Sequence, residues 1–127
     1  MVKYSASLQV LIVDEEPLIR WSLAETLADA GHVTLEAADG EAAIRAVSES
    51  VDVILLGYRL PDSSDLALIS TLRRLAPDSA IVVMTAHGTP DIIMEALRRG
   101  AHRVLAKPFE LHDLVALVNH ANSCRPV

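Results

Sequence analysis

Four residues that could take part in chemistry, and one glycine, directly follow short apolar runs of the chain. Asp14 and Glu15 come after the first run, and Gly57 comes after a later one. Thr85 and Lys107 lie at or just beyond the ends of two further runs. Ligands of open parallel sheets bind outside the carboxyl ends of the strands, so strands at these runs would bring all five positions to one edge. The two carboxylates, the hydroxyl and the ammonium could hold a hard cation and an anionic oxygen there.

The elements that must position these residues can be predicted from the pattern of apolar side chains. Most of the apolar runs are continuous and β-branched, which indicates strands covered on both faces. Segments of helical period separate them, with helix-start signals at Pro17 and Thr89 and a stop signal at Gly31. The alternation predicts an α/β domain with a parallel sheet, right-handed crossovers and helices on both faces. Strands are predicted at 8–13, 33–37, 51–56, 80–84 and 103–105, and helices at about 17–30, 40–50, 66–75, 89–100 and 111–122.

The first and last predicted helices each have one face that should be buried. In the first helix, Ile19, Leu23 and Leu27 repeat every four residues and form a single stripe. Trp21 in the same segment is expected to pack against the protein rather than to form a partner site. In the last helix the inward positions are Leu114, Val115, Leu117, Val118 and Ala121.

The composition favours a single globular domain over residues 1–127, with an ordered core at about 8–122. Hydrophobic residues make up 51% of the chain, which is enough to fill a core. Seventeen acidic and eleven basic side chains give a formal charge of −6, which argues against binding of nucleic acid by this domain alone. No apolar stretch approaches the roughly 20 residues that cross a bilayer, so we expect a cytoplasmic protein without membrane contact. The single cysteine, Cys124, excludes an internal disulfide.

Four segments, in the order and spacing of one known family, extend over nearly the whole chain. They are 10–17 (VLIVDEEP), 53–62 (VILLGYRLPD), 84–87 (MTAH) and 107–109 (KPF). Through them the chain resembles the receiver domains of two-component response regulators. The segments 19–21, 84–87 and 107–111 are most similar to the NtrC-like subgroup, which regulates sigma-54-dependent transcription. The resemblance implies a doubly wound, flavodoxin-like sheet of strand order 2-1-3-4-5, a role in phosphorelay signal transduction, and no enzymatic activity.

The resemblance also implies a role for each residue at the predicted edge. Asp14 and Glu15 match the acidic pair that binds Mg²⁺. Lys107 matches the lysine that pairs with the acceptor carboxylate and later with the phosphoryl group, and Thr85 matches the threonine that bonds a phosphoryl oxygen. The family's acceptor is an aspartate at the end of strand three, which attacks a kinase's phosphohistidine to form an acyl phosphate. Gly57 occupies this position and provides neither a nucleophile nor a third metal carboxylate, so the phospho-acceptor position is vacated.

Other features of the site follow from the missing carboxylate. Val104 occupies the position of the family's switch aromatic, so the ring rotation that accompanies the threonine movement has no ring. Asp14 and Glu15 alone would hold Mg²⁺ weakly at best, and no cofactor is expected beyond such weak magnesium binding. With no aspartate at position 57, Lys107 is predicted to pair with Asp14 or Glu15.

The residues leave alternatives open for several of these positions. Asp14 and Glu15 could be solvated caps at a helix N-terminus, and Thr85 could be a simple turn residue. His87 has no second ligand at a workable spacing and is interpreted as a loop residue rather than a metal ligand. A substitute acceptor among residues 62–65 is disfavoured, because none of them projects from the strand end where in-line attack must occur.

Three functions are compatible with these observations. The first is a phosphorylation-independent interaction module that binds a histidine kinase, an output domain or a second copy through the last two helices and strand five, with a homodimer as one outcome. The second is a conventional Mg-dependent phospho-accepting receiver of a transcription regulator, with a variant or engineered Asp-to-Gly change at 57. The third is a phosphatase or flavin protein of similar fold. It is disfavoured because no Asp-x-Asp follows strand one and Glu15-Glu16-Pro17 would repel a flavin phosphate.

Overall fold

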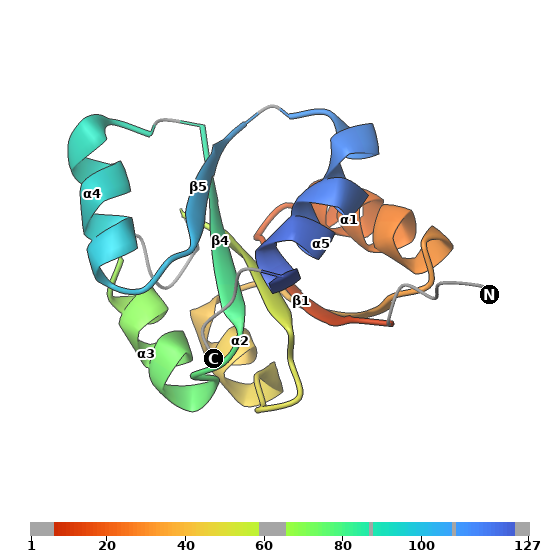
Figure 1. Ribbon diagram of the computed structural model, residues 1–127, viewed down its shortest axis with the longest axis horizontal. Coiled ribbons are helices and arrows are strands. Elements are labelled where there is room, and N and C mark those ends of the chain that lie inside the picture. The colour runs from red at the N-terminus through yellow and green to blue at the C-terminus, as the bar shows by residue number, and fades with distance from the viewer. Residues whose placement is uncertain (1–6, 59–65, 87, 108, 124–127) are drawn as a thin grey trace.

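Strands and helices alternate along the chain, as the apolar pattern predicts (Figure 1). The computed structural model describes residues 7–58, 66–86, 88–107 and 109–123. The predictions made for His87, Cys124 and residues 62–65 therefore lie outside the described residues. The strands are β1 (Gln9–Val13), β2 (Val33–Ala37), β3 (Val53–Gly57), β4 (Ala80–Thr85) and β5 (Arg103–Ala106). The helices are α1 (Pro17–Asp29), α2 (Gly40–Ala46), α3 (Ala67–Leu75), α4 (Pro90–Arg98) and α5 (Leu114–Ser123), and a 3-10 turn, η1 (Leu111–Asp113), precedes α5.

The five strands form one parallel sheet in the order β2-β1-β3-β4-β5, as the family resemblance implies. Strands β3 and β4 lie in the interior of the sheet and are buried at every position, which explains their continuous apolar sequences. The edge strands β2 and β5 are partly exposed, and they are the two that carry polar residues or are short. Among the described residues no helix has the length and apolar character needed to span a membrane.

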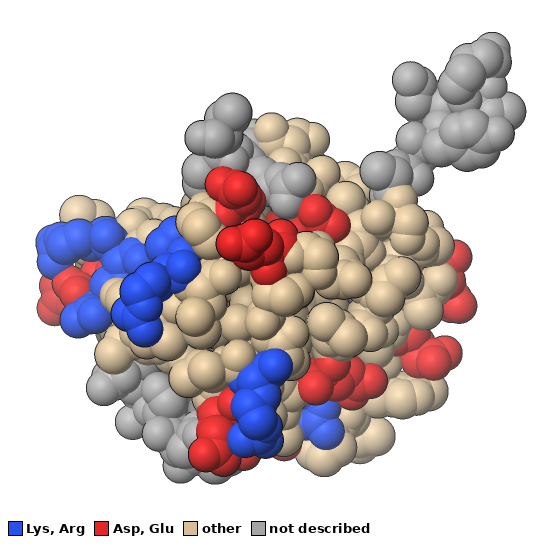
Figure 2. Space-filling model, turned by 90° about the horizontal axis from the view of Figure 1, so that it is seen from below, with Lys and Arg blue, Asp and Glu red and all other residues tan. Residues whose placement is uncertain are grey.

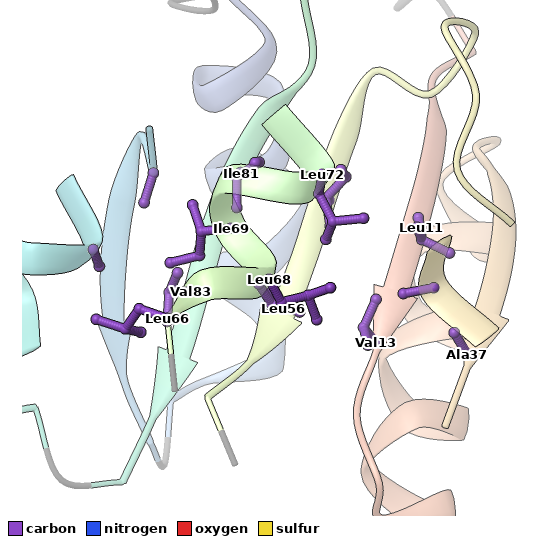
Figure 3. Packing of buried hydrophobic residues seen from close by; sticks show 14 of the residues in the cluster. Leu11, Val13, Ala37, Leu56, Leu66, Leu68, Ile69, Leu72, Ile81 and Val83 are labelled. Atoms are coloured by element: carbon purple, nitrogen blue, oxygen red, sulfur yellow. The ribbon is translucent and has the colours of Figure 1, made fainter. Parts of the chain in front are cut away.

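Helices cover both faces of the sheet and create two cores. On one face, α1 and α5 bury Leu23, Leu27, Leu114 and Val118 against alternate residues of β1, β3 and β4. On the other face, α2, α3 and α4 pack on the intervening strand residues. Figure 3 shows the second core, in which side chains of α3 lie against those of β3 and β4; the labelled members include Leu56, Leu68, Ile69, Leu72, Ile81 and Val83.

Two glycines end helices in the way the sequence predicts. Gly31 follows α1 with a φ of 94°, and Gly100 follows α4 with a φ of 117°. Only glycine adopts this left-handed backbone without strain, so both helices end where the sequence signals a stop.

Three local predictions are wrong. Helix α2 ends at Ala46 rather than near residue 50, because the Ser48 and Ser50 hydroxyls bond to each other and Ser48 accepts the Ser50 N–H, which competes with helical hydrogen bonds. The last helix begins as the 3-10 turn η1 and becomes α-helical only at Leu114. Trp21 is 57% exposed, since it lies two residues from Leu23 and therefore on the opposite side of the helix from the buried stripe.

Candidate functional site

The carboxyl ends of four strands bring the predicted residues together. Asp14 follows β1, Gly57 ends β3, Thr85 ends β4 and Lys107 follows β5. Parallel registry places Gly57 opposite Met84 on the neighbouring strand β4. The strand ends border a cleft of about 170 Å³ lined by Asp14, Glu15, Glu16, Tyr58, Met84, Thr85, Ala86 and Lys107.

Asp14 is the buried charge at the centre of this edge. Its side chain is 3% exposed, and its Oδ2 accepts a hydrogen bond from Lys107 Nζ at 2.8 Å. Its Oδ1 accepts the main-chain N–H of Glu16 at 2.9 Å, a turn that leads directly into α1. Both oxygens of the carboxylate are thus bonded, as a buried charge requires. The predicted ion pair of Lys107 is confirmed, and its partner is Asp14 rather than the exposed Glu15.

Arg20 supports the same loop, a role that the sequence did not reveal. From α1, its Nη1 donates to the main-chain oxygen of Asp14 at 2.7 Å, and its Nε pairs with Glu36 Oε1 on β2 at 3.2 Å. The guanidinium therefore ties the loop after β1 to the helix and to the edge strand. The apolar stripe of α1 predicts which face of the helix is buried but not the direction of the Arg20 side chain. Only the three-dimensional structure shows this contact.

The space around residue 57, and not its backbone conformation, limits which side chains fit there. Gly57 is buried within β3 and is not one of the glycines with a positive φ. A Cβ added there would lie 3.2 Å from Asp14 Oδ2 and 3.2 Å from the main-chain oxygen of Val13. The oxygen of Asp14 that bonds Lys107 is therefore one of the two atoms, with the main-chain oxygen of Val13, that any side chain at position 57 would meet first.

The other predicted positions differ in how far they face the cleft. Thr85 is 4% exposed, and its main-chain oxygen accepts the N–H of Lys107 at 2.8 Å, which fixes the two strand ends relative to each other. Val104 lies beside Val83 in the sheet and packs, partly buried, on the α2, α3 and α4 side. Within the described ranges, no three His, Cys, Asp or Glu side chains group closely enough to hold a metal ion.

A larger apolar hollow adjoins the cleft and was not predicted. It has a volume of about 470 Å³ and lies between the start of α1 and η1; its lining residues are Leu18, Ile19, Ser22, Leu23, Ala86, Lys107, Phe109 and Leu111. Leu18 is 78% exposed and Leu111 is 40% exposed. The signal in the sequence was the apolar residue Leu18, which falls outside the buried stripe of the helix.

Comparison with known proteins shows the family of the chain. Residues 10–119 match the response regulator receiver domain. Since the match extends over most of the chain, the protein belongs to the response regulator receiver family.

Relatives within the family are regulators of transcription. The DNA-binding transcriptional regulator NtrC of Escherichia coli K12 is 36% identical over 115 residues, which cover 90% of this chain and 24% of NtrC. The transcriptional regulatory protein PdtaR of Mycobacterium tuberculosis H37Rv is 36% identical over 119 residues, or 91% of this chain and 57% of PdtaR. The crystal structure of the receiver domain of NtrX from Brucella abortus is similar with a TM-score of 0.81 at 30% identity, covering 91% of this chain and 98% of that domain. The chain thus spans about a quarter of the length of NtrC and little more than half of PdtaR.

Proposed function

We propose that this receiver domain regulates its partners without accepting a phosphoryl group. The observation that carries the proposal is the end of β3, where the buried Gly57 faces Asp14 and offers no carboxylate. Lys107, which in the family pairs with the acceptor, is bonded to Asp14 instead. Acyl phosphate formation needs a carboxylate oxygen close to the metal and the lysine, and position 57 has none.

The partner surface of the proposal is formed by α4, β5 and α5. On α4 only Ala96 is buried, whereas Met94 is 59% exposed and Leu97 is 42% exposed. Exposed apolar side chains of this size favour contact with another protein over contact with water. A histidine kinase, an output domain and a second copy of the chain are the candidates. NtrC and PdtaR are transcriptional regulators, so we place this domain within a regulator of the same kind.

The distribution of charge supports a protein partner rather than nucleic acid. Figure 2 shows the largest group of basic side chains at the left, on the side of α3 and α4, whose last turns carry Arg73, Arg74 and Arg98, and smaller basic areas beside acidic ones at the lower centre of that face. Within this group Glu95 pairs with both Arg98 and Arg99. A phosphate backbone is held by a continuous basic surface, and here the basic group is small and partly neutralised.

A second candidate is a conventional phospho-accepting receiver that carries a change at position 57. The observation that favours it is the retention of Asp14, Thr85 and Lys107 at the strand ends, in the arrangement that a working site would use. Under this alternative, the codon at position 57 of the natural gene encodes aspartate.

The test is phosphorylation by a small donor. The native domain, Gly57→Asp and the matched control Gly57→Asn are incubated with acetyl phosphate and Mg²⁺, and each intact chain is weighed by mass spectrometry. In Gly57→Asp the introduced carboxylate oxygen attacks phosphorus, the bond from phosphorus to the acetate oxygen breaks, and acetate leaves with its electron pair. We expect a labile adduct of phosphoryl mass on this variant only, because asparagine has the same shape without the nucleophile. An adduct on the native domain would overturn the proposal.

Sedimentation of the same samples tests the regulatory half of the proposal. We expect the native domain to keep one sedimentation mass with and without the donor. A mass that changes with the donor in the native domain would contradict phosphorylation-independent association.

A further inference from the structure

The apolar hollow beside the cleft has the size and lining of a small-molecule site. Its volume of about 470 Å³ lies within the range of roughly 300–1,000 Å³ that is usual for such sites. Three separate parts of the chain form its walls: the start of α1, the residue Ala86 after β4, and the segment that leads into η1. We propose that the hollow binds one free amphipathic carboxylic acid, a small molecule with an apolar body and a single carboxylate.

The inner wall of the hollow is apolar and continuous with the core. Leu23 is buried in the core between α1, α5 and the sheet, and Ile19 and Phe109 pack partly buried against the same core. Leu18 and Leu111 are the more exposed apolar side chains of the lining. An alkyl or aromatic body placed among these residues removes apolar surface of both ligand and protein from water, which favours binding.

Two polar side chains in the lining, those of Ser22 and Lys107, can hold the head group of the ligand. Lys107 lines both the hollow and the cleft, and it is the only charged residue among the described residues that line the hollow. An ammonium has three N–H donors, and one of them bonds Asp14 Oδ2. The remaining donors and the Ser22 hydroxyl suit a carboxylate, because a hydrogen bond between two charged groups is stronger than one between neutral groups.

This inference stands apart from the proposed function, since Gly57 does not line the hollow. A bound acid would contact Lys107, whose ion pair with Asp14 joins the ends of β1 and β5. Binding in the hollow would therefore give the domain an input that needs no phosphoryl group.

The test is a titration of the isotope-labelled full chain with monomeric sodium octanoate at about pH 7, where the carboxylate is ionised. Main-chain amide resonances report where the ligand binds. We expect one saturable site per chain, with shifts at Ser22, Ala86 and Leu111 and none at Met94 and Leu97, which are exposed apolar residues of α4 outside the hollow. 1-Octanol has the same chain without the carboxylate and should bind about tenfold more weakly.

Substitutions in the hollow locate the ligand further. Ser22→Leu fills part of the space and should lower the octanoate affinity by about tenfold or more. Lys107→Met should lower it by about tenfold, and Lys107→Arg, which keeps the charge, should restore most of the loss. Met94→Ser is the matched control, since it removes an exposed apolar side chain elsewhere on the surface, and its affinity should equal that of the native domain.

The comparison of octanoate with octanol on the native domain does not depend on the folding of any variant. Equal affinity for the two ligands would overturn the proposal, as would the absence of saturable octanoate binding or an affinity that Ser22→Leu and Lys107→Met both retain. A second copy of the chain in the hollow would instead shift the resonances of Ser22, Ala86 and Leu111 when the protein concentration is raised without octanoate. That outcome would also overturn the proposal.

Discussion

Replacing Lys107 with methionine keeps much of the side chain's length and removes its charge. The change leaves the Asp14 carboxylate, 3% exposed, without the ammonium that bonds its Oδ2. Breaking a fully buried ion pair costs about 3–5 kcal/mol, and a hydrogen bond to a charged group contributes about 1.5–3 kcal/mol. Lys107 is 21% exposed, so water screens part of the interaction and the cost falls toward the lower figure. We expect Lys107→Met to lower the free energy of unfolding by about 2 kcal/mol.

Removing the other charge of the pair, with Asp14→Asn, should lower the free energy of unfolding by less than Lys107→Met does. The asparagine oxygen can still accept the N–H of Glu16, and the unpaired ammonium of Lys107 is the more exposed partner. We expect a loss of about 1 kcal/mol, which is the ordinary contribution of one hydrogen bond.

The double variant separates the interaction from the two individual changes. If the ion pair is the main interaction of both side chains, the second substitution adds little to the first, and the coupling energy is about 1 kcal/mol. Urea unfolding, followed by far-UV circular dichroism, measures the free energy of unfolding of the native domain, the two single variants and the double variant. The four proteins should share one m value, the slope of that free energy against urea concentration. Two single effects that add without coupling would refute the account of Asp14 as a buried charge that depends on Lys107.

Two further predictions concern the core and the dependence of stability on pH. Leu72→Ala removes a fully buried side chain from the core beneath α3 and should cost about 3 kcal/mol in urea unfolding, whereas the 37% exposed Leu75→Ala should cost less than about 1 kcal/mol; equal costs would contradict the assignment of the buried face. The lowered pKa of His102 means that the unfolded chain binds the proton more tightly than the folded chain does. The contribution of this residue to stability is therefore present above the ordinary histidine pKa of about 6.5. It is lost as the pH falls through that value toward the lower pKa of the folded state. His102→Gln should therefore flatten the decrease in unfolding free energy between about pH 7 and about pH 5, and an unchanged decrease would contradict this role.

Much of the fold could be predicted because each decisive signal is local. The continuous β-branched runs of β3 and β4 identify buried parallel strands, and Gly31 and Gly100 mark helix ends that require a positive φ. Where side chains compete with the backbone the prediction is wrong, as at Ser48 and Ser50 after α2. These serines are compatible with a helix by period, but their hydrogen bonds to each other and the bond from Ser50 Oγ to Gln9 Oε1 stabilise a loop instead.

The candidate site was predictable in position but not in its supporting contacts. Asp14, Thr85 and Lys107 meet because strand ends of a parallel sheet must meet. Which carboxylate pairs with Lys107 depends on burial, since Asp14 is buried and Glu15 is exposed. The reach of Arg20 to Asp14 depends on a side-chain direction that residue types do not encode.

Helix α4 is attached to the domain mainly at its C-terminal end. Arg73 of α3 donates from Nη2 to the main-chain oxygen of Gly100 at 2.7 Å, and Arg99 reaches Ser70 Oγ at 3.3 Å. The one buried residue of the helix, Ala96, lies near the same end. Ile92 in the first turn is only partly buried against the core, so a partner bound to α4 would tilt the helix about its hydrogen-bonded C-terminal end. The nine-residue helix is about 13 Å long, so a tilt of about 10° would move its N-terminal end, next to the loop that follows Thr85, through roughly 2 Å.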